Sequence, residues 1–303
     1  IIFKSWKKIK NSIKKKIYII SNHKLLHSQF KELGYSIKMV KVNTLNDNLN
    51  TNKLKILNMN LNFKKAFKIK ERDASKFVLD SLNYAHNLAL KKNVAGIINC
   101  PLNKKLLNKN KIGVTEFLAS KCQIKNNSEV MLIRNKKLSV CPITTHINLK
   151  EVAKKINKKI IINKVKIINA WFKKINNKKP RIGILGLNPH SAEFRIDSEE
   201  KKIIIPAVLK LKKLNINIKG PLAADTVFIN NYKKFDIIVG MYHDQVLSPF
   251  KTIFKFNAIN ITLGLKYLRM SPDHGVAVDL IGKNKADPIS LIECINFVNK
   301  IAK

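Results

Sequence analysis

The sequence predicts an α/β protein built around a mainly parallel β-sheet. Short apolar runs alternate with longer amphipathic stretches, which is the pattern of βα units. The chain has 303 residues and is 45% hydrophobic, enough for one large domain or two smaller ones. No apolar stretch reaches the roughly 18 residues that a membrane helix needs. We therefore expect a soluble protein with no membrane partner.

The elements follow the alternation of apolar and amphipathic segments along the chain. The strands are expected at Ile17 to Ile20, Ile37 to Val42, Ala95 to Ile98, Val130 to Ile133, Ile182 to Leu187 and Phe235 to Gly240. The helices are expected at Ala74 to Leu90, in part of Leu149 to Asn176, at Glu199 to Lys213 and at Ser290 to Ala302. The segment from Asn43 to Lys70 is rich in Asn and Lys and has weak periodicity, so we expect a variable excursion there rather than core.

The net charge of +40, from 59 basic and 19 acidic residues, would ordinarily indicate nucleic acid or an anionic membrane as partner. Here the excess is spread along the chain, mostly as lysine, and accompanies the abundant Asn and Ile that an AT-rich genome supplies. Arginine and aromatic residues are not interleaved in a basic patch, as single-strand binders require. We favour no nucleic-acid partner and keep a basic nucleic-acid-binding protein as the alternative of another class.

The cysteines and the first residues bear on the compartment. Cys100, Cys122, Cys141 and Cys294 are scattered and form no short-spacing metal or redox motif, so free thiols in a reducing cytoplasm are expected. The start at Ile1 does not have the pattern of a signal peptide and resembles a chain without its first residues. No Gly-x-Gly-x-x-Gly follows the early strands, so the cofactor-binding residues are unknown.

Three histidines each follow an apolar, strand-like run: His146, His190 and His243. A single histidine after a strand is more often a structural hydrogen-bonding residue than a ligand. Ligands of open α/β sheets, however, bind beyond the carboxyl ends of the strands, where three imidazoles can converge on one divalent metal ion. The joint pattern therefore favours a metal-dependent enzyme.

Two carboxylates accompany the histidines. Asp244 follows His243 directly and can orient that ring or bind substrate. Asp225 lies in a Gly-Pro-Leu-Ala-Ala-Asp-Thr turn, where it is either a helix cap or a functional group that takes a proton from a substrate hydroxyl or holds a substrate ammonium. Both are candidates for proton transfer.

Four further residues are candidates for contacts with substrate. Thr115 is either a helix cap or part of a phosphate site at a helix N-terminus. Lys251 is one lysine among many, and Asn260 equally suits a turn. Arg269 is a stronger candidate, since arginine is scarce here and its planar fork suits phosphate or carboxylate.

An ordered set of short motifs then resembles one enzyme family. The chain reads Pro-Leu-Asn-Lys, Gly-x-Thr-Glu-Phe, Thr-Thr-His, Gly-Leu-Asn-Pro-His, Gly-Pro-Leu-x-Ala-Asp-Thr, Met-Tyr-His-Asp-Gln, Asn-Ile-Thr-Leu-Gly-Leu and Asp-His-Gly, in this order. The set covers nearly the whole chain and is similar to the 4-hydroxythreonine-4-phosphate dehydrogenases of vitamin B6 biosynthesis.

The resemblance implies a fold like that of isocitrate and isopropylmalate dehydrogenases, with two α/β/α domains and a cleft between them. The first domain would comprise 1–120 with 275–303, and the second, 121–274, would carry metal ligands and dimer contacts. The resemblance also implies a homodimer with a shared active site. By motif, the family's metal ligands fall on His146, His190 and His243, and its substrate contacts fall on Thr115, Lys251, Asn260 and Arg269.

The implied reaction is the NAD- or NADP-dependent oxidative decarboxylation of 4-phosphohydroxy-L-threonine to 3-amino-2-oxopropyl phosphate, with Zn, Mg or Co as the divalent metal. Such a metal lowers the pKa of the substrate hydroxyl and favours hydride transfer to the nicotinamide. The nearest alternative is a related decarboxylating dehydrogenase that acts on another phosphorylated hydroxy acid. A third interpretation is a homologue without catalytic activity.

Three departures from the family pattern bear on these alternatives. Val114 stands where the family has histidine before the Thr-Glu pair. Ser191 to Phe194 stand where the family is glycine-rich, which affects the local loop geometry. The family's N-terminal glycine-rich segment, which precedes a stretch like Ile1 to Trp6, is absent from the residues given.

Overall fold

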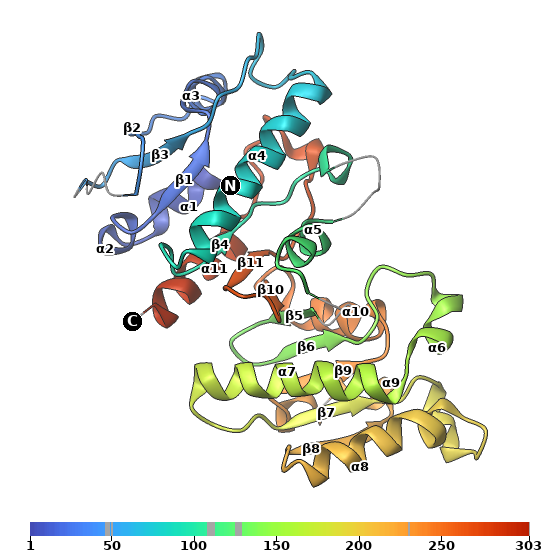
Figure 1. Cartoon of the computed structure of the whole chain (residues 1–303). Helices are drawn as coiled ribbons and strands as arrows, with labels where there is room; N and C mark the ends of the chain where they lie inside the picture. The colour runs from blue at the N-terminus through green and yellow to red at the C-terminus, as the bar shows by residue number, and fades with distance from the viewer. Residues whose placement is uncertain (46–48, 50, 108–112, 125–128, 230, 303) are drawn as a thin grey trace. The chain divides into compact units, whose positions relative to one another are not determined.

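The computed structural model describes residues 1–302 with the exception of 46–48, 50, 108–112, 125–128 and 230 (Figure 1). The chain divides into two compact units. Unit 1 comprises Ile1–Cys122 and Lys266–Lys303, and unit 2 comprises Gln123–Leu265. The predicted assignment of metal ligands and dimer contacts to one domain stays a prediction.

Unit 1 contains a three-stranded parallel sheet in the order β1-β3-β2, made of Tyr18–Ser21, Leu54–Asn58 and Met39–Val42. A second parallel pair joins β4 (Ile97–Ile98) to β11 (Arg269–Pro272). The helices of unit 1 are α1 (Ile2–Lys8), α2 (Asn11–Lys14), α3 (His23–Glu32), α4 (Glu71–Leu90), α5 (Val114–Lys121) and α11 (Ile289–Ile301). Short 3₁₀ turns lie at Lys104–Leu107 and Val278–Leu280.

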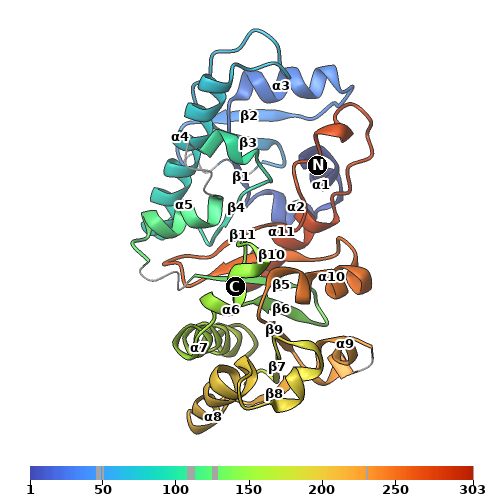
Figure 2. The same ribbon diagram turned by 90° about the vertical axis from the view of Figure 1, so that its right-hand side faces the viewer.

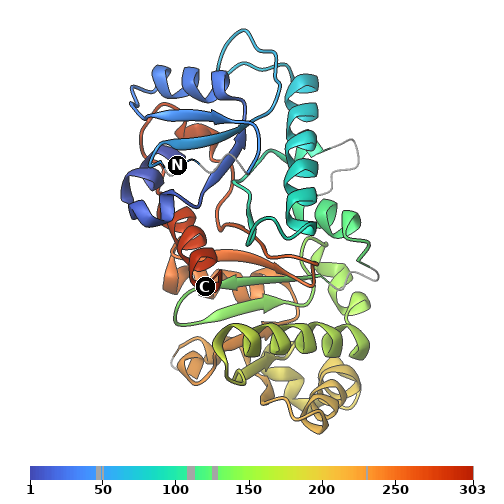
Figure 3. The same cartoon turned by 60° about the vertical axis from the view of Figure 1, so that its left-hand side comes forward.

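Helices cover both faces of the unit 1 sheet because its strands are apolar on both sides. Ile19 packs into a cluster with residues of α1, α3 and α11, which include Trp6 and Phe30. Ile20, the next residue along β1, packs on the opposite side against Ala85 of α4. Figures 2 and 3 show α1 and α4 on opposite sides of β1. The alternation along β1 therefore produces an α/β/α arrangement within this unit.

The expectation that Asn43 to Lys70 is a variable excursion is wrong in its central part. Residues Leu54–Asn58 form β3, the middle strand of the three-stranded sheet, and Leu54 and Ile56 are fully buried. Lys55 interrupts the apolar run and hides the strand in the sequence. Its side chain is buried too; its ammonium donates to the Lys15 carbonyl and lies 4.0 Å from the centroid of the Tyr18 ring. Burial lowers the pKa of Lys55.

Unit 2 contains six strands in the order β10-β5-β6-β9-β7-β8. Strands β6, β9, β7 and β8 run parallel, whereas β5 runs antiparallel to β6 and β10. The strands are β5 (Val130–Arg134), β6 (Ser139–Pro142), β7 (Ile182–Leu185), β8 (Ile218–Leu222), β9 (Ile237–Gly240) and β10 (Ile259–Leu263). The helices are α6 (Val152–Lys155), α7 (Lys158–Asn176), α8 (Ile205–Lys213), α9 (Ala224–Val227) and α10 (His243–Phe254), with shorter turns at Leu149–Glu151, Pro189–Phe194, Glu200–Ile204 and Asn231–Lys234.

The unit 2 sheet is covered by helices on both faces, with α7 and α8 on one and α9 and α10 on the other (Figure 2). On the α10 face, Val246 and Phe250 pack against strand residues such as Val140 and Ile238. In α7, buried residues recur with helical spacing at Ile161, Val165, Ile168 and Phe172. Strands buried on both faces explain the continuous apolar runs that the sequence shows.

The predicted α/β class is confirmed, and each predicted strand and helix overlaps an observed one. The lysine-rich helices α1 to α3, helix α10 and strands β8, β10 and β11 were not anticipated from the sequence. In the described part of the chain, every helix is too short or too polar to cross a membrane.

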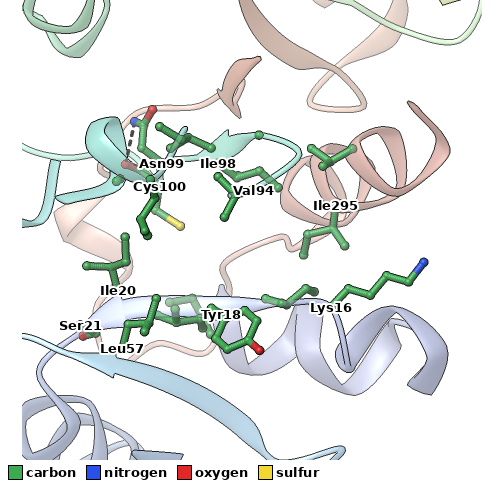
Figure 4. A pocket seen from close by; sticks show the side chains of 18 of the residues that line it. Lys16, Tyr18, Ile20, Ser21, Leu57, Val94, Ile98, Asn99, Cys100 and Ile295 are labelled. Atoms are coloured by element: carbon green, nitrogen blue, oxygen red, sulfur yellow. Dashed lines mark hydrogen bonds between the residues drawn. The ribbon is translucent and has the colours of Figure 1, made fainter. Parts of the chain in front are cut away.

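An apolar cavity of about 620 Å³ lies within unit 1 (Figure 4). Strand β1, the segment 93–100 around β4, and helices α1, α4 and α11 line it, with Tyr18, Ile98 and Ile295 among the side chains in view. The hydroxyls of Ser5 and Ser81, both in the lining, are buried and accept and donate no hydrogen bond. No residue predicted to bind metal or substrate lines this cavity.

Candidate functional site

The three strand-end histidines follow three consecutive parallel strands of the unit 2 sheet. His146 follows β6, His190 follows β7 and His243 follows β9, and these strands are neighbours in the order β6-β9-β7. The carboxyl ends of parallel neighbours meet at one edge of a sheet, which is the usual ligand-binding edge of α/β proteins. The three loops therefore emerge side by side (Figure 2).

Two of the three imidazoles are close together. The ring centroids of His146 and His243 are 5.8 Å apart, with 39° between the ring planes. His190 is largely exposed, and its Nδ1 lies 3.9 Å from Oδ2 of Asp225. Among the residues that the structure describes, no three His, Cys, Asp or Glu side chains form a group ready to hold a metal ion. As a donor set, three imidazoles at one sheet edge fit a divalent transition metal.

Asp244 lies directly against one of these rings. Its Oδ1 is 2.6 Å from Nδ1 of His243, the first residue of α10. The carboxylate accepts a hydrogen bond from Nδ1, so Nδ1 carries the hydrogen. The lone pair of Nε2 then remains to bind a metal ion. Histidine ligands are commonly oriented in this way. The contact favours the interpretation that Asp244 orients His243.

Asp225 does not cap a helix. It lies in the first turn of the short helix α9, whose N-cap is Ala223 and has no side-chain hydrogen bond. Its side chain is about half exposed and faces Nδ1 of His190 at 3.9 Å. The interpretation of Asp225 as a helix cap is therefore wrong. Its carboxylate is accessible and lies beside His190.

The loop that carries His190 has an unusual backbone. Residues His190 to Phe194 have φ angles of 51°, 55°, 52°, 49° and 58°, all in the left-handed region. For a residue with a Cβ, this conformation costs roughly 1–2 kcal/mol relative to the right-handed helical region. The family is glycine-rich in this segment. This chain has Ser, Ala, Glu and Phe there, although the left-handed backbone favours glycine.

Asn260 and Lys251 lie on different elements of unit 2. Asn260 is in strand β10 rather than in a turn, and its Oδ1 is buried with no hydrogen-bond partner. A buried amide oxygen without a partner is costly unless a ligand or water satisfies it. Lys251 lies in α10, with its ammonium 5.8 Å from the ring centroid of Phe256.

Thr115 and Arg269 come together within unit 1. Arg269 is only 3% exposed, and its guanidinium donates to Oγ1 of Thr115 at 3.2 Å and to Oδ1 of Asn99 at 2.7 Å. Burial lowers the pKa of Arg269 to about 10, and the nearby Glu116 carboxylate opposes that shift. Helix α5 begins at Val114 with Gly113 as N-cap, so Thr115 is not the cap.

Two polar residues, Asn99 in unit 1 and Glu200 in unit 2, were not identified from the sequence. Asn99 follows β4 and holds Arg269 in place. Glu200 is fully buried and binds the chain just before His190. A polar residue directly after an apolar run was an available signal for Asn99, but the sequence around Glu200 has the pattern of an ordinary helix start.

Comparisons with known proteins place this architecture among α/β dehydrogenases. The structure resembles the crystal structure of a 4-hydroxythreonine-4-phosphate dehydrogenase from Klebsiella pneumoniae, with a TM-score of 0.83, 26% identity and coverage of 97% of this chain and 95% of that one. The corresponding protein of Burkholderia phymatum gives a TM-score of 0.81, 28% identity and coverage of 99% and 93%.

The sequence comparisons are more specific. The model of the family described as pyridoxal phosphate biosynthetic protein PdxA matches residues 13–298. A 4-hydroxythreonine-4-phosphate dehydrogenase of Sulfurihydrogenibium sp. is 39% identical over 282 residues, which cover 91% of this chain and 86% of that relative. A protein of Oceanobacillus iheyensis, provisionally named a D-threonate 4-phosphate dehydrogenase, is 36% identical over 73% of this chain and 68% of its own length. The chain belongs to the PdxA family, and the resemblance inferred from its motifs is confirmed.

Proposed function

We propose that this protein catalyses the NAD- or NADP-dependent oxidative decarboxylation of 4-phosphohydroxy-L-threonine to 3-amino-2-oxopropyl phosphate, a step in pyridoxine 5'-phosphate biosynthesis. The observation that carries the proposal is the family match over residues 13–298 in a chain in which three of the histidines follow three consecutive parallel strands. A nicotinamide cofactor supplies the hydride acceptor for such a reaction.

The proposed metal ligands are His146, His190 and His243. Their imidazoles favour a transition metal such as Zn or Co over Mg, which prefers oxygen ligands. When bound, such a metal supplies the positive charge that lowers the pKa of a hydroxyl placed beside it. The ring centroids of His146 and His243 are 5.8 Å apart, which supports the proposal that both imidazoles bind one metal ion.

The two aspartates are proposed to act in different ways. Asp244 orients His243 through Nδ1, which presents Nε2 as the ligand atom. Asp225 is half exposed and is the candidate that accepts the proton of the substrate hydroxyl. Each assignment rests on the contact of the carboxylate with its neighbouring histidine.

The proposed substrate contacts are Thr115, Lys251, Asn260 and Arg269. The buried Oδ1 of Asn260 has no partner in the protein, which supports a polar ligand there. At Thr115, an anionic group would lie near the buried guanidinium of Arg269. The attraction between these two charges is stronger there than in water, because the surrounding dielectric is lower. Lys251 would act as a second cation for phosphate or carboxylate.

We also propose that the protein is a homodimer in the cytoplasm. The four cysteines are free thiols, which fits a reducing compartment. Sedimentation equilibrium of the purified protein tests the dimer, and a monomer at micromolar concentration would contradict it.

The test of function is NADH or NADPH formation from 4-phosphohydroxy-L-threonine by the full-length protein, with chelator and then with added Zn, Co or Mg. We expect turnover that chelator abolishes and one metal restores. Substitution of His146 by alanine should abolish that metal-dependent turnover. Turnover that is indifferent to chelator and to His146 would contradict the three-histidine assignment.

A second candidate substrate is another phosphorylated hydroxy acid. Val114 favours this alternative, because an apolar residue stands beside Thr115 where the family has histidine, and because one relative is named for D-threonate 4-phosphate. Assays with both substrates distinguish the two candidates, and Val114→His should then shift preference toward 4-phosphohydroxy-L-threonine. Failure on both substrates with metal bound and the dimer intact would indicate a homologue without catalytic activity.

A further inference from the structure

One side chain of unit 2 joins two of the three histidine-bearing loops. Gln245 lies in α10 and is 9% exposed. Its Oε1 accepts a hydrogen bond from the Met241 amide at 2.7 Å, and its Nε2 donates to the Gly186 carbonyl at 2.7 Å. Met241 follows β9 and Gly186 follows β7. The same amide therefore binds the strand ends that lead to His243 and to His190.

The loop with His146 is attached to the same point. Thr144, two residues before His146, donates from Oγ1 to the Met241 carbonyl at 2.7 Å, and its own amide donates to that carbonyl at 3.1 Å. Met241 thus contacts Gln245 through its amide and Thr144 through its carbonyl. All three histidine-bearing loops are joined through Met241 and Gln245.

Glu200 holds the other side of the His190 loop. Its Oε1 accepts from the Leu187 and Asn188 amides at 2.7 and 2.8 Å, and its Oε2 accepts from Nδ2 of Asn188 at 3.0 Å. The carboxylate is fully buried. The two residues that precede Pro189 and His190 are therefore fixed on one side by Glu200 and tied through Gly186 to Gln245.

The two glycines of this network leave no space for a side chain. A Cβ at Gly240 would lie 2.5 Å from Cγ1 of Val246 and 2.9 Å from Oε1 of Gln245. A Cβ at Gly186 would lie 2.7 Å from Oγ of Ser191 and 3.0 Å from Oε1 of Glu200. Both strand ends must be glycine for the Gln245 and Glu200 side chains to approach this closely.

We propose that Gln245 is a positioning residue for the three-histidine site: through Gly186 and Met241 its amide fixes the mutual positions of the loops that carry the metal ligands. This inference rests on the proposed function. Residues that hold ligands in place commonly contribute about 10- to 100-fold to metal affinity, because ligands that must reorganise bind less tightly. Gln245 would act through the Met241 amide and the Gly186 carbonyl and would touch neither metal nor substrate.

The test is the affinity of the metal-free protein for Co²⁺ and Zn²⁺ by isothermal titration, compared between wild type, Gln245→Leu and Gln245→Glu. Leucine keeps the volume and removes both hydrogen bonds. Glutamate keeps an acceptor for Met241 but cannot donate to the Gly186 carbonyl. We expect metal affinity to fall by about 10- to 100-fold in both variants, with Thr144→Val giving a smaller loss in the same direction.

The matched control is Thr252→Ala, in the same helix, whose exposed hydroxyl bonds only to the Ser248 carbonyl one turn earlier. It should bind metal as the wild type does. A folded Gln245→Leu protein, judged by circular dichroism at the titration temperature, that binds Co²⁺ and Zn²⁺ like the wild type would overturn the positioning role while the proposed function stands. Wild-type protein that binds neither metal would overturn the histidine site itself and the positioning role with it.

Discussion

Two sets of buried polar side chains, one in each unit, differ in whether they find hydrogen-bond partners. In unit 2, the polar side chains of Gln245 and Glu200 are satisfied by backbone groups at the strand ends. In unit 1, the hydroxyls of Ser5 and Ser81 border an apolar cavity without a hydrogen bond. The comparison teaches that burial alone does not mark function: a polar network aimed at loop backbone fixes geometry, whereas isolated hydroxyls in an apolar lining do not.

Each unit has its own tryptophan, which allows the comparison to be tested unit by unit. Trp6 is buried in the core of unit 1, and Trp171 lies in α7 of unit 2. Variants that keep only one of them report urea unfolding of one unit at a time by fluorescence. The unfolding of each unit is followed in these single-tryptophan backgrounds.

The largest effect is expected from Glu200→Ala. Removal of the carboxylate leaves the Leu187 and Asn188 amides without acceptors inside the protein, which costs roughly 3 kcal/mol or more. The free energy of unfolding reported by Trp171 should fall by that amount. Glu200→Gln retains one acceptor oxygen and should lose less. A Glu200→Ala variant as stable as the wild type would show that the carboxylate does not hold this loop.

A smaller effect, in unit 1, is expected from Arg269→Met. Methionine preserves much of the buried volume but leaves Oδ1 of Asn99 without its donor, at a cost of about 1–3 kcal/mol. Trp6 fluorescence should report the loss, with Trp171 fluorescence as the comparison. Arg269→Lys cannot reproduce the fork to Thr115 and Asn99 and should recover little. Full recovery with lysine would contradict the role of the two hydrogen bonds.

The pH dependence of unit 2 should follow Glu200. Burial acts to raise the pKa of this carboxyl, but the hydrogen bonds from Asn188 and Leu187 outweigh it and leave the pKa below the usual 4.5. The stabilisation is therefore present above pH 4.5 and is lost as the pH falls through the lowered pKa. Unfolding reported by Trp171 should become easier in that window, and Glu200→Gln should flatten the profile. An unchanged acid profile in that variant would assign the sensitivity to other groups.

The smallest effect is expected from Ser81→Ala in unit 1. Alanine removes a buried hydroxyl that has no partner, so the variant should be as stable as the wild type or up to about 1 kcal/mol more stable. The matched change in unit 2, Thr144→Val, should instead cost about 1 kcal/mol, because it breaks the bond to Met241. Opposite signs in urea unfolding would sharpen the comparison between the units, and equal losses would break it.

Much of the fold was predictable because apolar runs and amphipathic stretches alternate locally. Strand β3 was missed because Lys55 interrupts its apolar run, and only the structure shows that this lysine is buried over Tyr18. The lysine-rich helices α1 to α3 were missed because their charge obscures the apolar face. These failures arise where a long charged side chain covers or enters the core.

The candidate site also has a part that was predictable from the sequence and a part that was not. The strand-end positions of His146, His190 and His243 follow from local pattern, and the family match is consistent with them. The partners of Gln245 and Glu200 were not predictable, because the bond from Gln245 to Gly186 joins positions 59 residues apart. No local spacing encodes such a contact; it appears only when β7 and β9 are placed side by side.

The cavity of unit 1 has a mechanical consequence. Hydrostatic pressure favours the state of smaller volume, and unfolding eliminates internal voids in proportion to their size. The pocket of about 620 Å³ is mainly apolar and partly open, so water that enters it finds few hydrogen-bond partners, and its poorly packed volume is lost on unfolding. Under pressure, Trp6 should therefore report unfolding before Trp171, and larger side chains that fill the cavity should delay it.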